Sequence, residues 1–230
     1  MIILLSGPNK RLGFSEEVKK VLNKELKGYK SLVAVAASES SEKNNKYFNG
    51  GEDSLGVNGM FGKLDVSINN YCLIDVNNTK EEIIDCINKS DIVYLMGGDP
   101  FVQLKLLNTI DYKKLLKDKI LIGVSAGSMN LAKYAYYSKD DDYPVTQFYE
   151  GLDIVDITID PHFDINNEEQ VIEAKNSSKN HKIIGLPNES GIVVRDNNIE
   201  YIGNYYVIEG GILKTDDGKH WQNWINDILY

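Results

Sequence analysis

The sequence is poor in the side chains that hold metal ions or form disulfide frameworks. Its 230 residues include two cysteines and three histidines: Cys72, Cys86, His162, His181 and His220. Two cysteines cannot form a disulfide framework or a four-thiolate zinc site, and three histidines leave little room for a metal centre. We therefore expect no metal and no other cofactor.

Arginine and long apolar runs are also scarce. Arg11 and Arg195 are the two arginines, and the formal net charge is −9. Nucleic-acid-binding domains usually present a net basic face, so we expect no nucleic-acid partner. No run approaches the roughly 20 apolar residues of a membrane helix, so no membrane association is expected. The apolar N-terminal run is too short for a signal peptide, which predicts a cytoplasmic protein.

The remaining composition is that of an ordinary folded domain. Hydrophobic residues make up 42% of the chain and charged residues 26%, close to average globular usage. Chains usually divide into several domains only above roughly 250 residues, so we predict one domain over residues 1–230.

Short apolar runs alternate with amphipathic segments over the first half of the chain. We predict strands at 2–5, 31–37, 66–74, 91–96 and 119–124, and helices at 15–26, 80–88, 101–108 and from 125 onward. Residues 38–63 are polar and glycine-rich, and we expect them to be irregular or partly helical. This alternation predicts an α/β fold with a doubly wound, mainly parallel sheet and helices on both faces.

The pattern changes after residue 182. Strand-like runs at 182–186, 191–195, 199–202 and 205–208 are separated by Asn, Asp and Gly. Such spacing predicts antiparallel hairpins at the C-terminal edge of the sheet. Residues 221–230 are expected to form a closing helix.

The strongest chemical signal is the pentapeptide Gly-Val-Ser-Ala-Gly at 123–127, directly after a predicted buried strand. A G-x-S-x-G motif between strand and helix holds its serine in a sharp, strained turn, so that the hydroxyl projects above the sheet edge. The backbone N–H of Ala126 then lies at the start of the helix, where it can stabilise an oxyanion. We therefore predict that Ser125 is a nucleophile.

A serine nucleophile needs a general base. His162 follows the strand-like run 154–159, and strand ends are where such sheets present catalytic groups, so we favour it. His220 stays an alternative, because α/β-hydrolases place their base late in the chain. His181 lies in a polar connection and is expected to be a solvated surface residue.

A third group should orient the imidazole of the base. Glu189 lies between two apolar runs, Asp142 lies in an acidic loop, and Asp160 and Asp164 flank the histidine. The turn Gly97–Pro100 follows another predicted strand, and its glycines can bring a second backbone N–H to the oxyanion. No P-loop lysine follows this turn, so a phosphate site is not expected.

Four segments together resemble peptidase E and its relatives, cyanophycinase among them, within the class I glutamine-amidotransferase-like superfamily. They are YLMGGDPFVQL at 94–104, IGVSAGSMNLA at 122–132, ITIDPHFD at 157–164 and IIGLPNESGIVV at 183–194. The resemblance covers most of the chain. It implies a flavodoxin-like sheet, a serine exopeptidase that uses no metal, and a homodimer.

By this resemblance Ser125 is the nucleophile and His162 the general base, Gly98 and Ala126 supply oxyanion N–H groups, and Gln103 lines the site. Peptidase E has an Asp in an Asp-x-Pro segment that Asp142 resembles, whereas other members use a Glu that Glu189 resembles. We prefer Glu189 as the third member, because its segment is expected to reach the same sheet edge.

One departure from the family concerns the substrate. Peptidase E cleaves an N-terminal aspartate from dipeptides, and recognition of that side-chain carboxylate should need a cation, best an arginine. In peptidase E an arginine stands shortly before the Asp-x-Pro segment, whereas the only basic residue in that region here is Lys139. We therefore predict a dipeptidase-like serine exopeptidase for short peptides that is not strictly aspartyl-specific. The alternatives are an α/β-hydrolase-type esterase that uses Ser125 and His220, and a non-catalytic binding or regulatory protein on the same scaffold.

Overall fold

The computed structural model describes residues 1–9, 11–50, 56–141, 143–196 and 198–215. Its centre is a seven-stranded sheet in the order β11-β10-β1-β5-β4-β2-β3. The strands are β1 (Ile2–Leu5), β2 (Ser31–Val35), β3 (Asn70–Ile74), β4 (Ile92–Leu95), β5 (Ile120–Val124), β10 (Gly191–Arg195) and β11 (Asn198–Ile202). Strands β1 to β5 run parallel, whereas β10 and β11 add an antiparallel hairpin beside β1.

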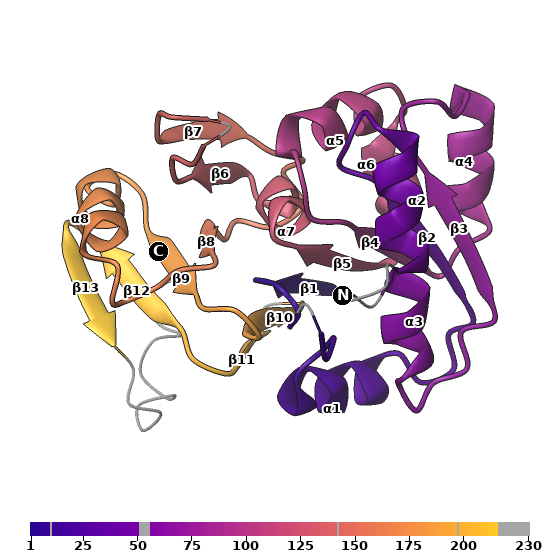
Figure 1. The fold of residues 1–230 in the computed structure, drawn as a ribbon, viewed down its shortest axis with the longest axis horizontal. Coiled ribbons are helices and arrows are strands. Elements are labelled where there is room, and N and C mark those ends of the chain that lie inside the picture. Colours follow the sequence, from indigo (N-terminus) through magenta and orange to yellow (C-terminus); the bar gives the residue numbers. More distant parts are fainter. Residues whose placement is uncertain (10, 51–55, 142, 197, 216–230) are drawn as a thin grey trace.

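Helices cover both faces of this sheet (Figure 1). Successive strand residues point to opposite faces, so Leu4 and Val33 pack into one apolar layer while Ile3 and Leu32 pack into the other. One layer receives helices α1 (Glu16–Glu25) and α3 (Val57–Gly62), and α2 (Ser41–Asn49) packs beside α3. The other receives α4 (Lys80–Asn88), α5 (Pro100–Leu107), α6 (Tyr112–Leu116) and α7 (Ala126–Leu131).

A second, four-stranded sheet lies beside the central one, in the order β13-β12-β9-β8 (Figure 1). It consists of β8 (Ile159–Pro161), β9 (Ile183–Leu186), β12 (Tyr206–Glu209) and β13 (Ile212–Thr215), with α8 (Glu168–Ser177) against β12. Strands β6 (Tyr134–Tyr137) and β7 (Gln147–Glu150) form a separate hairpin. The segment 187–190 crosses from β9 in the second sheet to β10 in the first, and so passes close to the end of β1.

The predicted fold class is confirmed, and several elements match closely. Helix α4 covers residues 80–88 as predicted, and Ser15 caps α1 by accepting a hydrogen bond from the backbone N–H of Val18. Within residues 38–63 two helices form, α2 and α3. None of the described helices combines the length and apolar character needed to cross a bilayer.

Other predicted elements differ from the structure. Strand β3 begins at Asn70, and residues 154–158 before the histidine are mostly irregular, because β8 is confined to Ile159–Pro161. The β6–β7 hairpin was not predicted, since its tyrosine-rich sequence lacks a clear alternation. The hairpins after residue 182 are divided between two sheets. The predicted closing helix at 221–230 and His220 lie outside the described residues.

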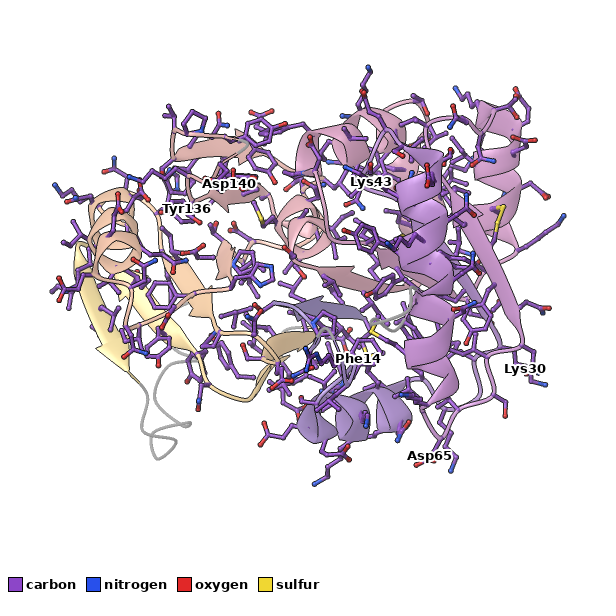
Figure 2. All side chains as sticks on the ribbon, in the orientation of Figure 1. Phe14, Lys30, Lys43, Asp65, Tyr136 and Asp140 are labelled. Atoms are coloured by element: carbon purple, nitrogen blue, oxygen red, sulfur yellow. A yellow bond between two sulfur atoms is a disulfide. The ribbon has the colours of Figure 1, made fainter. Side chains whose placement is uncertain are left out.

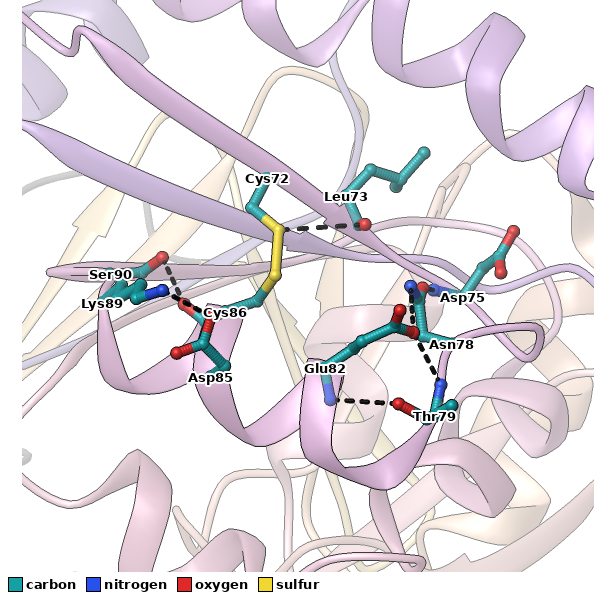
Figure 3. The surroundings of a disulfide bond; sticks show 10 residues. All are labelled: Cys72, Leu73, Asp75, Asn78, Thr79, Glu82, Asp85, Cys86, Lys89 and Ser90. Atoms are coloured by element: carbon teal, nitrogen blue, oxygen red, sulfur yellow. Dashed lines mark hydrogen bonds and ion pairs between the residues drawn. A yellow bond between two sulfur atoms is a disulfide. The ribbon is translucent and has the colours of Figure 1, made fainter.

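The two cysteines, too few for a disulfide framework, are bonded to each other in a single disulfide. The disulfide joins Cys72 on β3 to Cys86 on α4, with a Cα–Cα distance of 6.4 Å (Figure 3). Between them, Thr79 and Glu82 form a capping box at the start of α4. The bond therefore ties the edge strand of the central sheet to the helix that covers it.

Candidate active site

Ser125 lies in a strained turn between β5 and α7. Its backbone has φ +50° and ψ −115°, a region that residues with a side chain rarely occupy. Its backbone N–H donates to Leu5 O at 3.0 Å, so the turn is anchored to the end of the neighbouring parallel strand β1. Strain of this kind is retained where the surrounding structure over-determines it, typically at functional sites.

The two glycines that flank the serine are required by close packing. A Cβ on Gly123 would lie 2.5 Å from the backbone N of Ser128, and one on Gly127 would lie 2.2 Å from the carbonyl oxygen of Leu95. The strand and helix therefore approach more closely than any side chain permits. This geometry is the physical reason for the G-x-S-x-G spacing.

His162 lies at the end of β8, and its Nε2 atom is 2.8 Å from Oγ of Ser125. Its backbone N–H donates to Oγ of Ser6 at 2.8 Å, and Ser6 in turn donates to Leu186 O. A Cβ on Gly7 would lie 2.7 Å from Cε1 of the imidazole, so the ring packs directly against the Gly7 backbone. The loop after β1 thus holds the histidine beside the serine, although the two come from different sheets.

The other imidazole nitrogen, Nδ1, lies 2.6 Å from Oδ1 of Asn188. An amide oxygen can only accept a hydrogen bond, so this contact places the proton on Nδ1. Nε2 then presents its lone pair to the hydroxyl of Ser125, which is the arrangement that a general base needs.

The predicted contact between Glu189 and the histidine is replaced by Asn188. The backbone N–H of Glu189 donates to Gly7 O at 2.8 Å, with φ at +67°, and its carbonyl accepts from Oγ of Ser15. This turn directs the preceding side chain, that of Asn188, to the imidazole. The other candidate, Asp142, lies outside the described residues.

The two acidic residues that flank the histidine form hydrogen bonds with other residues. Asp160 is fully buried and accepts hydrogen bonds from Oγ of Ser138 at 3.0 Å and Nε2 of Gln170 at 3.3 Å. Burial raises the pKa of Asp160 to about 7, against the opposing effect of these hydrogen bonds. Asp164 accepts from the backbone N–H of Asn166 and shapes the turn after the histidine.

Gly98 and Ala126, the two predicted oxyanion donors, lie close to Ser125. Gly98 has φ +138°, and a Cβ there would lie 2.6 Å from Ala37 O, so only glycine fits. Ala126 is the first residue of α7. Together with Ser125 and His162 they line a cavity of about 380 Å³.

The structure places Gln103 away from this cavity, which corrects the prediction that it lines the site. Its side chain is fully buried, and Nε2 donates to Val35 O at 2.9 Å and Met96 O at 3.1 Å. Oε1 accepts from Asn130 Nδ2. Gln103 therefore links α5 by hydrogen bonds to the ends of β2 and β4 and to α7, and does not itself line the cavity.

A larger cavity, of about 860 Å³, meets the catalytic one at Gly98, Tyr137 and Asp140. Lys139, the one cation predicted near the site, also lines the smaller cavity. Its ammonium donates to Glu169 and lies 3.9 Å from Glu173, so two carboxylates balance its charge and raise its pKa. Figure 2 labels Tyr136, which is on β6, and Asp140, which follows β6 in the chain; both line the smaller cavity.

Three residues that hold the histidine were not predicted from the sequence: Ser6, Gly7 and Asn188. Each lies within two residues of the end of an apolar strand. Ser6 and Gly7 follow β1, and Asn188 follows β9. A rule that examines every polar or small residue after every strand would have included them. Their roles depend on β1 and β9 ending at the same place, which only the tertiary structure shows.

Comparison with known proteins gives a consistent result. The sequence profile of Peptidase family S51 matches residues 2–202. An uncharacterized peptidase of Pasteurella multocida, PM1590, is 26% identical over 131 residues, which are 49% of this chain and 63% of that protein, less than two thirds of its length. The uncharacterized peptidase Lin0382 of Listeria innocua is 24% identical over 183 residues, 74% of this chain and 83% of that protein.

Among solved structures, a peptidase from an acI-B1 Actinobacterium has the same fold. The two superimpose with a TM-score of 0.62 at 17% sequence identity, covering 94% of this chain and 96% of that one. The likeness extends over almost the whole chain and therefore includes the second sheet, which carries the histidine.

Proposed function

This chain belongs to peptidase family S51, and on that premise we propose that it is a serine peptidase, a dipeptidase-like exopeptidase that cleaves short peptides through an acyl-enzyme on Ser125. The observation that carries the proposal is the 2.8 Å contact between Oγ of Ser125 and Nε2 of His162. A hydroxyl on a strained elbow, paired with an oriented imidazole, is the arrangement of an activated nucleophile.

In the proposed first step, Oγ of Ser125 attacks the carbonyl carbon of the scissile peptide bond. Its proton passes to Nε2 of His162, whose cation is held in place by the Nδ1–H that donates to Asn188. The backbone N–H groups of Gly98 and Ala126 stabilise the negative charge that develops on the carbonyl oxygen.

The tetrahedral intermediate then collapses. His162 returns the proton to the nitrogen of the leaving amine, the C–N bond breaks, and the acyl group remains on Ser125. A water molecule then attacks this ester while His162 takes its proton. The bond between the acyl carbon and Oγ breaks, His162 returns the proton to Oγ of Ser125, and the acid product leaves. Each step moves a proton through the single imidazole that contacts the serine.

The substrate preference we propose is not strict for an N-terminal aspartate. Lys139 lines the catalytic cavity, but its charge is balanced by Glu169 and Glu173. A cation that is already ion-paired stabilises a substrate carboxylate weakly, and no arginine is among the described residues that line either cavity. We therefore expect comparable turnover of several dipeptides that differ in their first residue.

A fluorophosphonate probe combined with a dipeptide panel tests this proposal. The folded protein should be labelled, and Ser125→Ala and His162→Ala should abolish both labelling and release of amine. His181→Ala is the matched control, because His181 contacts the aromatic rings of Tyr134 and Phe148 and should leave turnover unchanged.

Three results would contradict the proposal. A folded protein that stays unlabelled would favour a non-catalytic binding role. Loss of turnover in His220→Ala but not in His162→Ala would favour the esterase arrangement. A strong preference for Asp-Xaa dipeptides would overturn the argument from Lys139.

A further inference from the structure

The catalytic histidine is held in a backbone conformation that residues with a side chain disfavour. His162 has φ +59°, in the left-handed region that residues other than glycine rarely occupy. It directly follows β8, which pairs with β9 and is the last strand of the second sheet. Such a conformation persists where the surrounding structure fixes it, so the contacts around this segment determine where the imidazole lies.

Two hydrogen bonds hold the backbone at the histidine itself. The N–H of His162 donates to Oγ of Ser6 at 2.8 Å, and the N–H of Phe163 donates to Leu186 O at 3.0 Å. These bonds fix the two peptide groups on either side of the Cα of His162. They do not hold the next peptide group, which leads into the turn at Asp164.

The side chain of Gln170 connects the residues before and after the histidine. It lies in the first turn of α8, where its Oε1 accepts from the backbone N–H of Asp164 at 2.9 Å and its Nε2 donates to Oδ2 of Asp160 at 3.3 Å. A backbone N–H can only donate, so the first contact identifies the oxygen of the amide and leaves its amino group for Asp160. Asp160 lies two residues before His162 and Asp164 two residues after it. One amide therefore links both ends of a five-residue segment.

The carboxyl group of Asp160 is a fixed anchor for this amide. Asp160 is fully buried, and its other oxygen, Oδ1, accepts from Oγ of Ser138 at 3.0 Å. Burial raises the pKa of Asp160 to about 7, and both its protonated and its ionised form present an oxygen that can accept from Nε2 of Gln170. Helix α8, which carries Gln170, packs against β12 of the same sheet (Figure 1). The amide is thus held at both ends by the second sheet and its helix.

We propose that Gln170 is a positioning residue of the peptidase reaction: its amide bridges Asp160 and Asp164 and so holds the imidazole of His162 at Oγ of Ser125. This inference rests on the proposed function. Nε2 of His162 lies 2.8 Å from Oγ, and a misplacement of about 1 Å can lower a rate about 10²-fold. Gln170 also lines the catalytic cavity, so direct contact with the substrate is the competing role.

Gln170→Met keeps the length of the side chain and removes both hydrogen bonds. Its kcat for Leu-Leu should fall about ten- to hundredfold, with KM within about threefold of wild type. The rate of labelling of Ser125 by a small fluorophosphonate should fall by a similar factor, because labelling needs the same imidazole but no peptide recognition. A higher KM with an unchanged labelling rate would show that Gln170 contacts the substrate, and would overturn the positioning role.

An exchange of donor and acceptor tests the bond between Gln170 and Asp160. Gln170→Glu still accepts from Asp164 but sets a second carboxyl group against Asp160, so at pH 9 repulsion between them should lower kcat by about tenfold or more. In Asp160→Asn/Gln170→Glu an amide N–H again faces an acceptor, and kcat should return to within about threefold of wild type. Failure of the double variant to exceed Gln170→Glu would contradict the proposed bridge.

Two further variants serve as controls. Asp160→Asn alone should stay active, since the introduced amide can accept from Gln170 and donate to Ser138. Gln147→Met makes the same chemical change as Gln170→Met at an exposed position of β7, and Gln147 is not among the described residues that line either active-site cavity. Its kcat, KM and labelling rate should equal those of wild type.

Fluorophosphonate labelling separates the two levels of the proposal. Absence of labelling and of turnover in the parent protein would overturn the peptidase function itself. Labelling of the parent protein and of Gln170→Met at the same rate would overturn only the role of Gln170. A lower melting temperature of Gln170→Met together with wild-type kcat would assign the two hydrogen bonds to folding alone, and would equally overturn the positioning role.

Discussion

Oδ1 of Asn188 lies 2.6 Å from Nδ1 of His162, so the group that contacts this nitrogen of the imidazole is a neutral amide. A carboxylate in this place would stabilise the imidazolium by charge as well as by hydrogen bonding. An amide supplies the hydrogen bond and the choice of tautomer alone. In the proposed mechanism, His162 therefore depends on the position of its imidazole rather than on an adjacent negative charge.

Replacement of Asn188 tests this relationship. Asn188→Ala should lower kcat by about 10²-fold with little change in KM, because the imidazole loses its fixed tautomer but the substrate cavity is unaltered. Asn188→Asp should stay active across pH 5–9, because the carboxylate accepts the same hydrogen bond from Nδ1–H and adds a negative charge beside the imidazole. Steady-state kinetics over this range measure both effects.

Glu189→Gln is the natural control for these variants, since Glu189 contributes backbone hydrogen bonds to the same turn. Its kcat should stay within about twofold of wild type, as expected for a surface substitution away from the reacting atoms. A large loss in Glu189→Gln together with wild-type activity in Asn188→Ala would restore Glu189 as the orienting residue.

The buried carboxyl of Asp160 should make stability depend on pH. Burial raises its pKa to about 7, above its ordinary value, so between about pH 4 and 7 the folded protein keeps a proton that the unfolded chain releases. The contribution of Asp160 to stability therefore falls as pH rises through this window and is constant above it. The side chain in Asp160→Asn does not ionise, so the stability of this variant lacks that dependence on pH.

Urea denaturation at several pH values measures this contribution. The free energy of unfolding of Asp160→Asn, relative to wild type, should increase from pH 5 to pH 7 and then level off. The constant offset between the proteins reflects the changed contacts with Ser138 and Gln170 and is not the readout. Parallel curves over the whole range would show that Asp160 is ionised in the folded state.

Two glycines distinguish close packing from simple helix propensity. Gly127→Ala should destabilise the protein by at least 1–3 kcal/mol, because the new Cβ would lie 2.2 Å from Leu95 O. Gly59→Ala, within α3, meets no atom within 4 Å and should stabilise the protein by about 0.5–1 kcal/mol. Thermal denaturation of both variants is the measurement, and equal melting temperatures would refute the packing argument.

The disulfide should contribute to stability but not to activity. Cys72 and Cys86 are 14 residues apart, and closing a loop of this length stabilises a fold by about 3 kcal/mol. The Cys72→Ser/Cys86→Ser double variant should melt about 6–12 °C lower, with unchanged kcat, because the bond lies at the edge of the sheet away from β1 and β5. A reductant should lower the melting temperature of the parent protein and have no effect on the double variant.

Much of the central sheet was predictable because its signals are local. The uniformly apolar run at Ser31–Val35 and the amphipathic run at Lys80–Asn88 each indicate an element without reference to the rest of the chain. The β6–β7 hairpin was not predictable in this way. Its pairing of Tyr136 with Phe148 joins segments separated by an acidic loop and depends on the second sheet beneath it.

The same division holds for the site. Ser125 is identified by a pentapeptide whose geometry is local, and His162 by its place at a strand end. The partner of His162 could not be chosen from sequence, because Asn188 and Glu189 are adjacent and the sense of one turn decides which side chain faces the ring. That turn is set by hydrogen bonds to Gly7 and Ser15, more than 170 residues away in the chain.

The sequence by itself determined the alternating fold, the serine elbow and the scarcity of histidine and arginine that limits the choice of base and of substrate cation. The tertiary structure decided which side chain contacts Nδ1 of His162, that Lys139 is ion-paired, and that Cys72 and Cys86 are joined. The physical reason is the distance along the chain between the residues that each feature depends on. Strand, helix and elbow depend on neighbours in the chain, whereas the orienting contact, the ion pairs and the disulfide depend on which elements the folded sheets bring together.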